Sequence, residues 1–300
     1  MSEVNPASVT LPRRLLAEVI GTGLLVSVVV GSGIAAQQLS PGNTGLQLLE
    51  NSTTTVVGLA VLILILILMH GPVSGAHFNP VVTAADWLLG RRTSTGIAGV
   101  RIAPYIAAQT IGAVAGAILA NAMFDLPLVE ISGTDRAGTG HGIGEIVATA
   151  GLVALIFLLA RTGRHALSAA AVGAYIGAAY WFTSSTSFAN PAVTIGRIFT
   201  DTFAGIAPGS VPLYIGAQII GAAVGLALVI ALFPQHMTTS EPAAVCHARP
   251  PQRSRRPDDR QTSRAVRLRP QRRPLSDGRR LPHGTRPRQD RGPLRGVHTR

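Results

Sequence analysis

The chain has little charge and almost no cysteine. Only 13% of its 300 residues are charged, whereas 47% are hydrophobic. This composition leaves two classes, a soluble protein with a large core or a membrane protein. Cys246 is the single cysteine, which excludes an intrachain disulfide and a thiolate metal cluster. We therefore expect no redox chemistry, no metal and no cofactor.

Positive charge is also scarce outside the end of the chain. Residues 238–300 hold 17 Arg against 5 acidic residues, whereas residues 1–237 hold 9 of each. The pI near 11.5 thus describes a basic tail on a neutral apolar body, and we expect no nucleic-acid partner. We divide the chain into a polar N-terminal segment (1–14), a membrane domain (15–237) and an Arg/Pro-rich tail (238–300) expected to be disordered.

Long apolar segments, in contrast, are abundant. A bilayer core about 30 Å thick takes roughly 20 residues of helix to cross. Six segments approach this length, which predicts an all-α integral membrane protein that crosses the lipid bilayer six times. No cleavage site precedes the first segment, so it is expected to be a retained span rather than a signal peptide. The segments are 15–37, 53–70, 101–122, 143–160, 167–183 and 211–233.

Most basic residues that precede the tail lie before the first span or on alternate connections between the spans, whereas the opposite loops, 38–52 and 123–141, carry Arg136 as their only basic residue. Positively charged short loops stay in the cytoplasm. The pattern therefore predicts that both termini are cytoplasmic, in a bacterial-type inner membrane. The residues on that side are Arg13, Arg14, Arg91, Arg92, Arg101, Arg161 and Arg164.

The two halves of the membrane domain repeat one another. The segment PYIAAQTIGAVAG from Pro104 matches LYIGAQIIGAAVG from Leu213, with Gln109 aligned on Gln218. Each half contains three spans, so the halves enter the membrane in opposite senses. This is the inverted repeat of many transporters and channels.

A short motif recurs in the loops after the second and fifth spans. Its Asn suits a helix N-cap, and its Pro suits the first helical position, where the missing N–H costs nothing. The apolar stretch that follows has about ten residues, too few to cross the bilayer. We expect two half-helices whose N-termini meet at the midplane around a water-filled cavity. The motifs are Asn79, Pro80, Val81 and Asn190, Pro191, Ala192.

Paired boxes of this kind in a six-span inverted repeat resemble the aquaporin and aquaglyceroporin family, over residues 15–233. The resemblance implies a six-helix bundle with two re-entrant half-helices, one pore per protomer, and a homotetramer. It implies that Asn79 and Asn190 donate hydrogen bonds to a single file of water or solute hydroxyls. The half-helix N-termini would repel protons and cations. A passive channel, not an enzyme, is the function it implies.

Three ionisable residues of the membrane domain need an explanation. A charge inside a span costs roughly 2.5–3.5 kcal/mol on insertion scales, so Glu18 and Glu145 must have partners. Either they form a proton relay, or each accepts hydrogen bonds from the re-entrant loop of its own half, as family members do. His77, beside the first box, is either a titratable gate or a structural hydrogen-bonding residue.

The narrowest part of the pore departs from the family pattern. Family members usually have an Arg directly after the second box, and here that position is Val193. Arg197, four residues on and on the same helical face, is a candidate substitute. Family spacing places Ser187, Ala178 and Leu59 at the same constriction. Because these three are small or aliphatic, we expect a wide and weakly polar filter.

A filter of this kind suits neutral polyols and hydroxides, such as glycerol and arsenous acid, As(OH)3. The Val-for-Arg pattern also resembles the channels of bacterial arsenic-resistance operons. Two alternatives stay open: an orthodox water or glycerol channel, and a proton-coupled transporter that uses Glu18 or Glu145. An enzyme bound through the tail is disfavoured, because the tail has one Cys and three His in no usable spacing.

The tail carries an independent hint. Residues 266–277, VRLRPQRRPLSD, can be encoded by codons that read FVCVHNAGRSQM in a neighbouring frame. That peptide resembles the oxyanion loop of phosphatase-like arsenate reductases, which also occur fused to such channels. The tail is therefore either a frameshifted remnant of a fused reductase or a basic arm that lies on anionic lipid. Resequencing the locus tests the first hypothesis.

Overall fold

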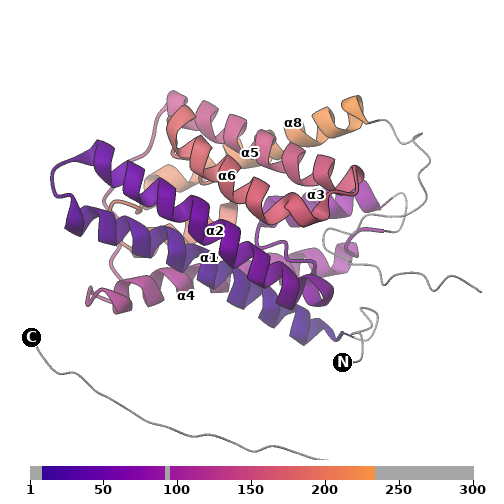
Figure 1. Cartoon of the computed structure of the whole chain (residues 1–300), viewed down its shortest axis with the longest axis horizontal. Helices are drawn as coiled ribbons and strands as arrows, with labels where there is room; N and C mark the ends of the chain where they lie inside the picture. Colours follow the sequence, from indigo (N-terminus) through magenta and orange to yellow (C-terminus); the bar gives the residue numbers. More distant parts are fainter. Residues whose placement is uncertain (1–8, 92–94, 234–300) are drawn as a thin grey trace, which may run out of the picture. The chain divides into compact units, whose positions relative to one another are not determined.

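The computed structural model describes residues 9–91 and 95–233, with the backbone alone at 62–63 and 65–72. The tail, together with every hypothesis about it, lies outside the described residues. Six long helices form the bundle in Figure 1. They are α1 (Leu11–Leu39), α2 (Thr44–Ser74), α4 (Ile102–Met123), α5 (Thr139–Arg161), α6 (Ser168–Phe182) and α8 (Val211–Leu232).

Two short helices lie between the long ones in the sequence. They are α3 (Pro80–Gly90) and α7 (Pro191–Gly196), which begin directly after the two Asn residues of the motifs. A 3-10 turn, η4 (Arg197–Phe199), extends α7. The described part of the chain therefore contains the six long helices and two half-helices expected from the sequence. The second half-helix, α7, has 6 residues of α-helix before the 3-10 turn begins, which is shorter than the stretch of about ten residues expected from the sequence.

Length and hydropathy identify membrane-crossing helices in the described residues. Four satisfy both criteria: Leu11–Leu39, Gly99–Met123, Thr139–Arg161 and Pro208–Leu232. The other two long helices are α2, whose central side chains are not described, and α6, which has 15 residues. A 3-10 turn, η3 (His165–Leu167), leads directly into α6 and adds length to it.

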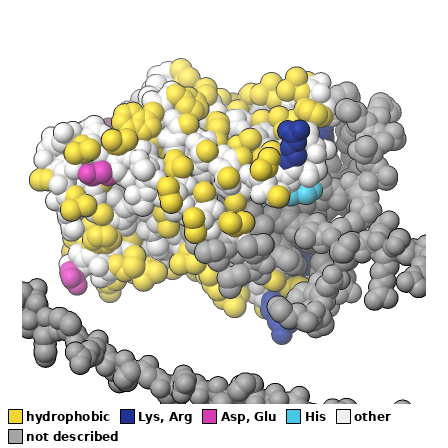
Figure 2. All heavy atoms as spheres, viewed as in Figure 1, with side chains coloured by type: hydrophobic (Ala, Val, Ile, Leu, Met, Phe, Trp, Pro, Cys, Tyr) yellow, Lys and Arg dark blue, Asp and Glu magenta, His cyan; other side chains and the backbone are white. Residues whose placement is uncertain are grey.

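The surface of the bundle is apolar where lipid is expected. On the face in Figure 2, hydrophobic side chains cover the middle, and acidic and basic side chains lie near opposite ends. Large aliphatic side chains face outward from several long helices, including Leu16 at 57%, Ile111 at 62% and Ile219 at 58% exposure. Such exposure is unfavourable in water and favourable in a bilayer.

Glycines allow the inner helices to cross at close range. Gly112 and Gly116 of α4 lie against the backbone of α1 at Val19 and Gly23. The repeat places Gly221 and Gly225 of α8 against α5 in the same way, where an added Cβ would lie 2.6 and 2.5 Å from backbone carbonyl oxygens. Small residues at helix crossings are the usual means of tight packing in membranes. Each half therefore contains a close helix crossing at a pair of glycines, α4 against α1 and α8 against α5.

Candidate functional site

The two half-helices begin at the same kind of cap. The side-chain oxygen of Asn79 accepts the N–H of Val81 at 3.0 Å, and that of Asn190 accepts the N–H of Ala192 at 3.0 Å. Both Asn residues have extended backbones, and a Pro follows each of them at the first helical position. Each box is thus a capped helix N-terminus, as the sequence predicts.

The side-chain amides of the two Asn residues connect the halves. Asn79 Nδ2 donates to the carbonyl of Ala189 at 2.9 Å, and Asn190 Nδ2 donates to the carbonyl of Phe78 at 2.8 Å. The half-helix N-termini therefore meet in the bundle. Each amide has two N–H groups, so each keeps one donor beyond this bond.

Glu18 holds the first re-entrant loop. Its carboxylate accepts the backbone N–H groups of His77 at 3.1 Å and Phe78 at 2.7 Å. Ser74 Oγ and Gln109 Nε2 also donate to it, both at 2.7 Å. The side chain is completely buried. Four donors from the same half of the chain thus satisfy a buried carboxylate, as burial of such a group requires.

Glu145 repeats this arrangement in the second half. It accepts the backbone N–H groups of Phe188 and Ala189, each at 2.8 Å. Ser185 Oγ donates at 2.7 Å and Gln218 Nε2 at 2.6 Å. Each carboxylate therefore accepts hydrogen bonds from the re-entrant loop of its own half, which is the alternative to a proton relay, and it fixes the loop before the box.

The loops held by these carboxylates are strained. Ala76 and Phe78 have φ values of 53° and 50°, and the equivalent Ser187 and Ala189 both have 49°. Non-glycine residues rarely occupy this left-handed region, and each costs of order 1–3 kcal/mol. Strain of this kind persists only where the surroundings enforce it, and the hydrogen bonds to Glu18 and Glu145 do so here.

The two loops and the surrounding helices enclose a cavity of about 100 Å³. Asn79 and Asn190 both line it. Most of its other lining residues are aliphatic and come from the long helices and half-helices. They include Leu25, Val29, Val82, Leu152, Ile156, Val172 and Ile176. The boxes therefore place a few polar groups on an otherwise apolar wall, an arrangement typical of small-molecule sites.

Four of the five residues assigned to the constriction line this cavity, namely Leu59, Ser187, Val193 and Arg197. Ala178 does not line it, contrary to the expectation from family spacing. It lies exposed on the outer side of α6. Tyr180, two residues further on, is 3% exposed and lines the cavity instead.

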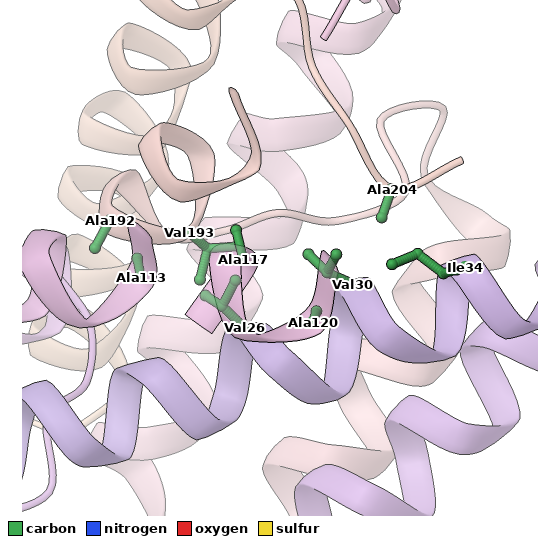
Figure 3. Packing of buried hydrophobic residues seen from close by; sticks show 9 residues of the cluster. All are labelled: Val26, Val30, Ile34, Ala113, Ala117, Ala120, Ala192, Val193 and Ala204. Atoms are coloured by element: carbon green, nitrogen blue, oxygen red, sulfur yellow. The ribbon is translucent and has the colours of Figure 1, made fainter. Parts of the chain in front are cut away.

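Val193 belongs both to the cavity wall and to a packed apolar cluster. Figure 3 shows it beside Val26 of α1 and Ala117 of α4, and Val30 of α1 belongs to the same cluster. The side chain is 3% exposed. No hydrogen bond can come from an aliphatic side chain, so this part of the wall is apolar. The hydroxyl of Ser187 is buried without a hydrogen-bond partner in the described part of the chain.

Arg197 is buried against an aromatic ring. Its Cζ lies 3.4 Å from the centroid of Phe188, and its Nε donates to the carbonyl of Ala204. The residue is 2% exposed. The sequence did not single out Phe188, which also lines the cavity.

His77 lies on the cavity wall in the first half. Its Nδ1 is 3.2 Å from Thr83 Oγ1, and its Nε2 is 3.7 Å from a carboxylate oxygen of Asp86. The ring also contacts Tyr105, with centroids 5.7 Å apart. Among the described residues, no group of three or more His, Cys, Asp or Glu is placed to hold a metal ion.

Several supporting residues were missed, although the internal repeat contains the signal for them. Aligning the two boxes pairs Ser74 with Ser185, which donate to the two carboxylates. It also pairs Thr83 with Thr194, and these hydroxyls accept from Gln109 and Gln218 at 2.9 Å. Two buried tyrosines complete the set, because their hydroxyls donate to the serine carbonyls. They are Tyr105 and Tyr214.

Taken together, the inverted halves, the half-helices that meet at their N-termini and the cavity between them define a membrane channel for small solutes. A family model described as major intrinsic protein matches residues 5–188. The chain belongs to the major intrinsic protein family. The fold of this family has six transmembrane helices and two half-helices, and its aquaglyceroporins are passive channels rather than enzymes.

Individual relatives agree with this assignment. The chain is 48% identical over 219 residues to the aquaglyceroporin AqpS of Rhizobium meliloti, covering 73% of this chain and 89% of that one. It is 32% identical to human aquaporin-2 over 256 residues, covering 79% and 85%. The X-ray structure of the aquaglyceroporin from Plasmodium falciparum superposes with a TM-score of 0.52 at 20% identity. It covers 73% of this chain and 95% of that one, and supports the fold alone.

Proposed function

We propose that the chain is a channel for small uncharged polyols and trivalent metalloid hydroxides, such as glycerol and arsenous acid, with or without water. The observation that carries this proposal is the wall at Val193. Where the family pattern has an Arg, this chain presents an aliphatic side chain that also packs against α1 and α4. At the level of Val193, a wall without a charged side chain leaves room for solutes larger than water.

The polar groups of the cavity would orient such solutes. Asn79 and Asn190 each keep one amide N–H, and Ser187 contributes a hydroxyl that can donate or accept. A polyol or a metalloid trihydroxide presents several hydroxyls, so it can exchange hydrogen bonds with these groups in succession. Leu59 and Tyr180 would limit the width of the path. The relative AqpS is described as an aquaglyceroporin, which agrees with this solute class.

Two other functions remain as outcomes of the test. An orthodox channel would pass water or glycerol and exclude arsenous acid. A proton-coupled transporter would use Glu18 or Glu145 as a carrier. The second is disfavoured, because each carboxylate accepts four hydrogen bonds from groups that hold its loop, and moving a proton onto it would disrupt them.

We further propose the setting of this channel. It would sit in a bacterial inner membrane as a homotetramer with both termini in the cytoplasm, since the basic residues of the body favour that orientation. Residues 15–237 would form the channel and residues 238–300 a separate tail. Cross-linking of the reconstituted protein tests the tetramer. Protease accessibility in oriented membrane vesicles tests the position of the termini.

The solute assignment is tested by stopped-flow light scattering on vesicles that contain the full chain. Native vesicles are expected to pass glycerol and arsenous acid, and Val193→Arg is expected to suppress both while sparing water. The matched control is Val193→Thr, which keeps the shape of the side chain and adds no charge, and should keep the larger solutes. Native vesicles that pass water alone would show that the metalloid assignment is wrong.

A further inference from the structure

The internal repeat gives the two half-helices opposite charges at equivalent positions. Seven residues after the box Asn, the first half carries Asp86 and the second carries Arg197. Both side chains face the residue two positions before the box Asn. Asp86 lies 3.7 Å from His77, and Arg197 lies 3.4 Å from the ring centroid of Phe188. The pore is thus electrostatically asymmetric along its length, although its backbone repeats.

A second arginine strengthens the positive half. Arg136, from the loop between α4 and α5, has its Cζ 5.4 Å from the same Phe188 ring. Its Nη2 donates to the carbonyl of Phe203 at 2.9 Å, and its Nε donates to that of Gly205 at 2.8 Å. The carbonyl between these two, that of Ala204, accepts from Arg197. Three successive carbonyls thus hold both guanidinium groups beside one ring.

These two arginines lack acidic partners in the part of the chain that the structure describes, where neither has a carboxylate oxygen within 4.0 Å. Carbonyl dipoles and a ring face orient a guanidinium but do not neutralise it, and the carboxylate of Glu145 acts on both arginines only from beyond ion-pair distance. Arg197 also lines the cavity and is 2% exposed, so little solvent screens it. A cation that enters the cavity from this end would face this charge first.

We propose that Arg197, reinforced by Arg136, forms a barrier to cations and protons in this pore, in addition to the half-helix N-termini and displaced along the half-helix from Val193. Four residues of helix correspond to an axial shift of about 6 Å. The wall at Val193 can then be apolar and wide enough for neutral solutes, because ion exclusion is performed at a different level. Width and charge selectivity are thereby separated. This inference does not depend on which neutral solute passes.

The size of the effect follows from Coulomb's law. A unit charge about 5 Å from a passing cation, at an effective dielectric constant of about 20, alters the crossing rate by roughly two orders of magnitude. Other barriers along the pore remain after its removal. We therefore expect Arg197→Met to raise proton and potassium leak by about tenfold or more, and Arg136→Met by about threefold, since Arg136 lies further from the cavity.

The test uses vesicles containing the full chain, in which proton and potassium leak and glycerol flux are measured on the same preparation. Arg197→Lys keeps the charge and is expected to keep the leak low. The matched control is Asp86→Asn, which removes the charge at the equivalent position of the first half and should not raise the leak.

Glycerol flux reports whether each variant has assembled. A leak that stays at the native level in Arg197→Met vesicles that still pass glycerol overturns the proposal. If Arg197→Met fails to assemble, Arg136→Met decides: a raised leak supports the barrier, and an unchanged leak overturns it. An equal rise of the proton and potassium leak in Asp86→Asn vesicles would also overturn it, because the leak would then not depend on the sign or the position of the charge that is removed. The Val193→Arg experiment on solute size is unaffected by any of these outcomes.

Discussion

The crossing of α5 and α8 offers a sharp test of the packing, because one helix contains both a tight and an open glycine. At Gly225, an added Cβ would lie 2.5 Å from the carbonyl oxygen of Ala150, about 0.9 Å closer than the ordinary contact distance of 3.4 Å. At Gly216, nine residues earlier in α8, an added Cβ meets no atom within 4 Å. Alanine is therefore expected to have opposite effects at the two positions.

The magnitudes follow from two competing effects. Alanine stabilises a helix by about 0.5–1 kcal/mol relative to glycine, and this gain applies at both positions. Forcing a methyl group into backbone that cannot yield costs about 1–3 kcal/mol or more. Gly225→Ala should thus lower the free energy of unfolding by about 1–2 kcal/mol, whereas Gly216→Ala should raise it by up to about 1 kcal/mol.

Both variants can be compared with the native chain in mixed micelles, by titrating SDS and following helix content by circular dichroism. A difference between Gly225→Ala and Gly216→Ala of at least about 1.5 kcal/mol is expected from these terms. Equal stabilities would refute the inferred close approach of the two helices. A gain at both positions would show that α5 and α8 separate at little cost.

Three further predictions concern the polar groups. Glu145→Gln replaces one acceptor oxygen with a donor and loses two hydrogen bonds. It should therefore lower the free energy of unfolding by about 3 kcal/mol or more in the same SDS titration. The control is the exposed Glu130→Gln, which should change it by under about 0.5 kcal/mol. Ser187→Ala removes the unpartnered hydroxyl of the cavity and should reduce glycerol permeation about two- to tenfold in stopped-flow assays, without loss of folded protein. Glycerol flux should be the same with and without an imposed pH gradient, and dependence on the gradient would instead favour a carrier role for Glu18 or Glu145.

The sequence predicts the architecture well because its constraints are strong. A bilayer requires apolar helices of fixed minimum length, and an inverted repeat doubles every signal. The capped half-helices at Asn79 and Asn190 follow from the same local chemistry in both halves. The buried position of Glu18 and Glu145 likewise follows from the cost of a charge inside a span.

Side-chain positions around the cavity were harder to predict. Family spacing counted back from Asn190 predicts Ala178 at the constriction, but residues 186, 187 and 189 adopt left-handed conformations that a count cannot reveal. Tyr180 therefore lines the cavity in its place. The stacking of Arg197 on Phe188 depends on carbonyls in a loop that follows η4, and no periodic pattern in the sequence encodes that path.

The hydrogen bonds that the Asn side chains exchange between the two halves also bear on how such a pore could be assembled. Asn79 reaches the carbonyl of Ala189, and Asn190 reaches that of Phe78, so each half supplies a donor that only the opposite half can accept. A fragment that ends after α4 would keep the hydrogen bonds between Glu18 and its re-entrant loop. The carbonyl of Phe78 would, however, lose the hydrogen bond that Asn190 donates to it. Two fragments cut between α4 and α5 should consequently complement one another in the same membrane, whereas neither should conduct when expressed by itself.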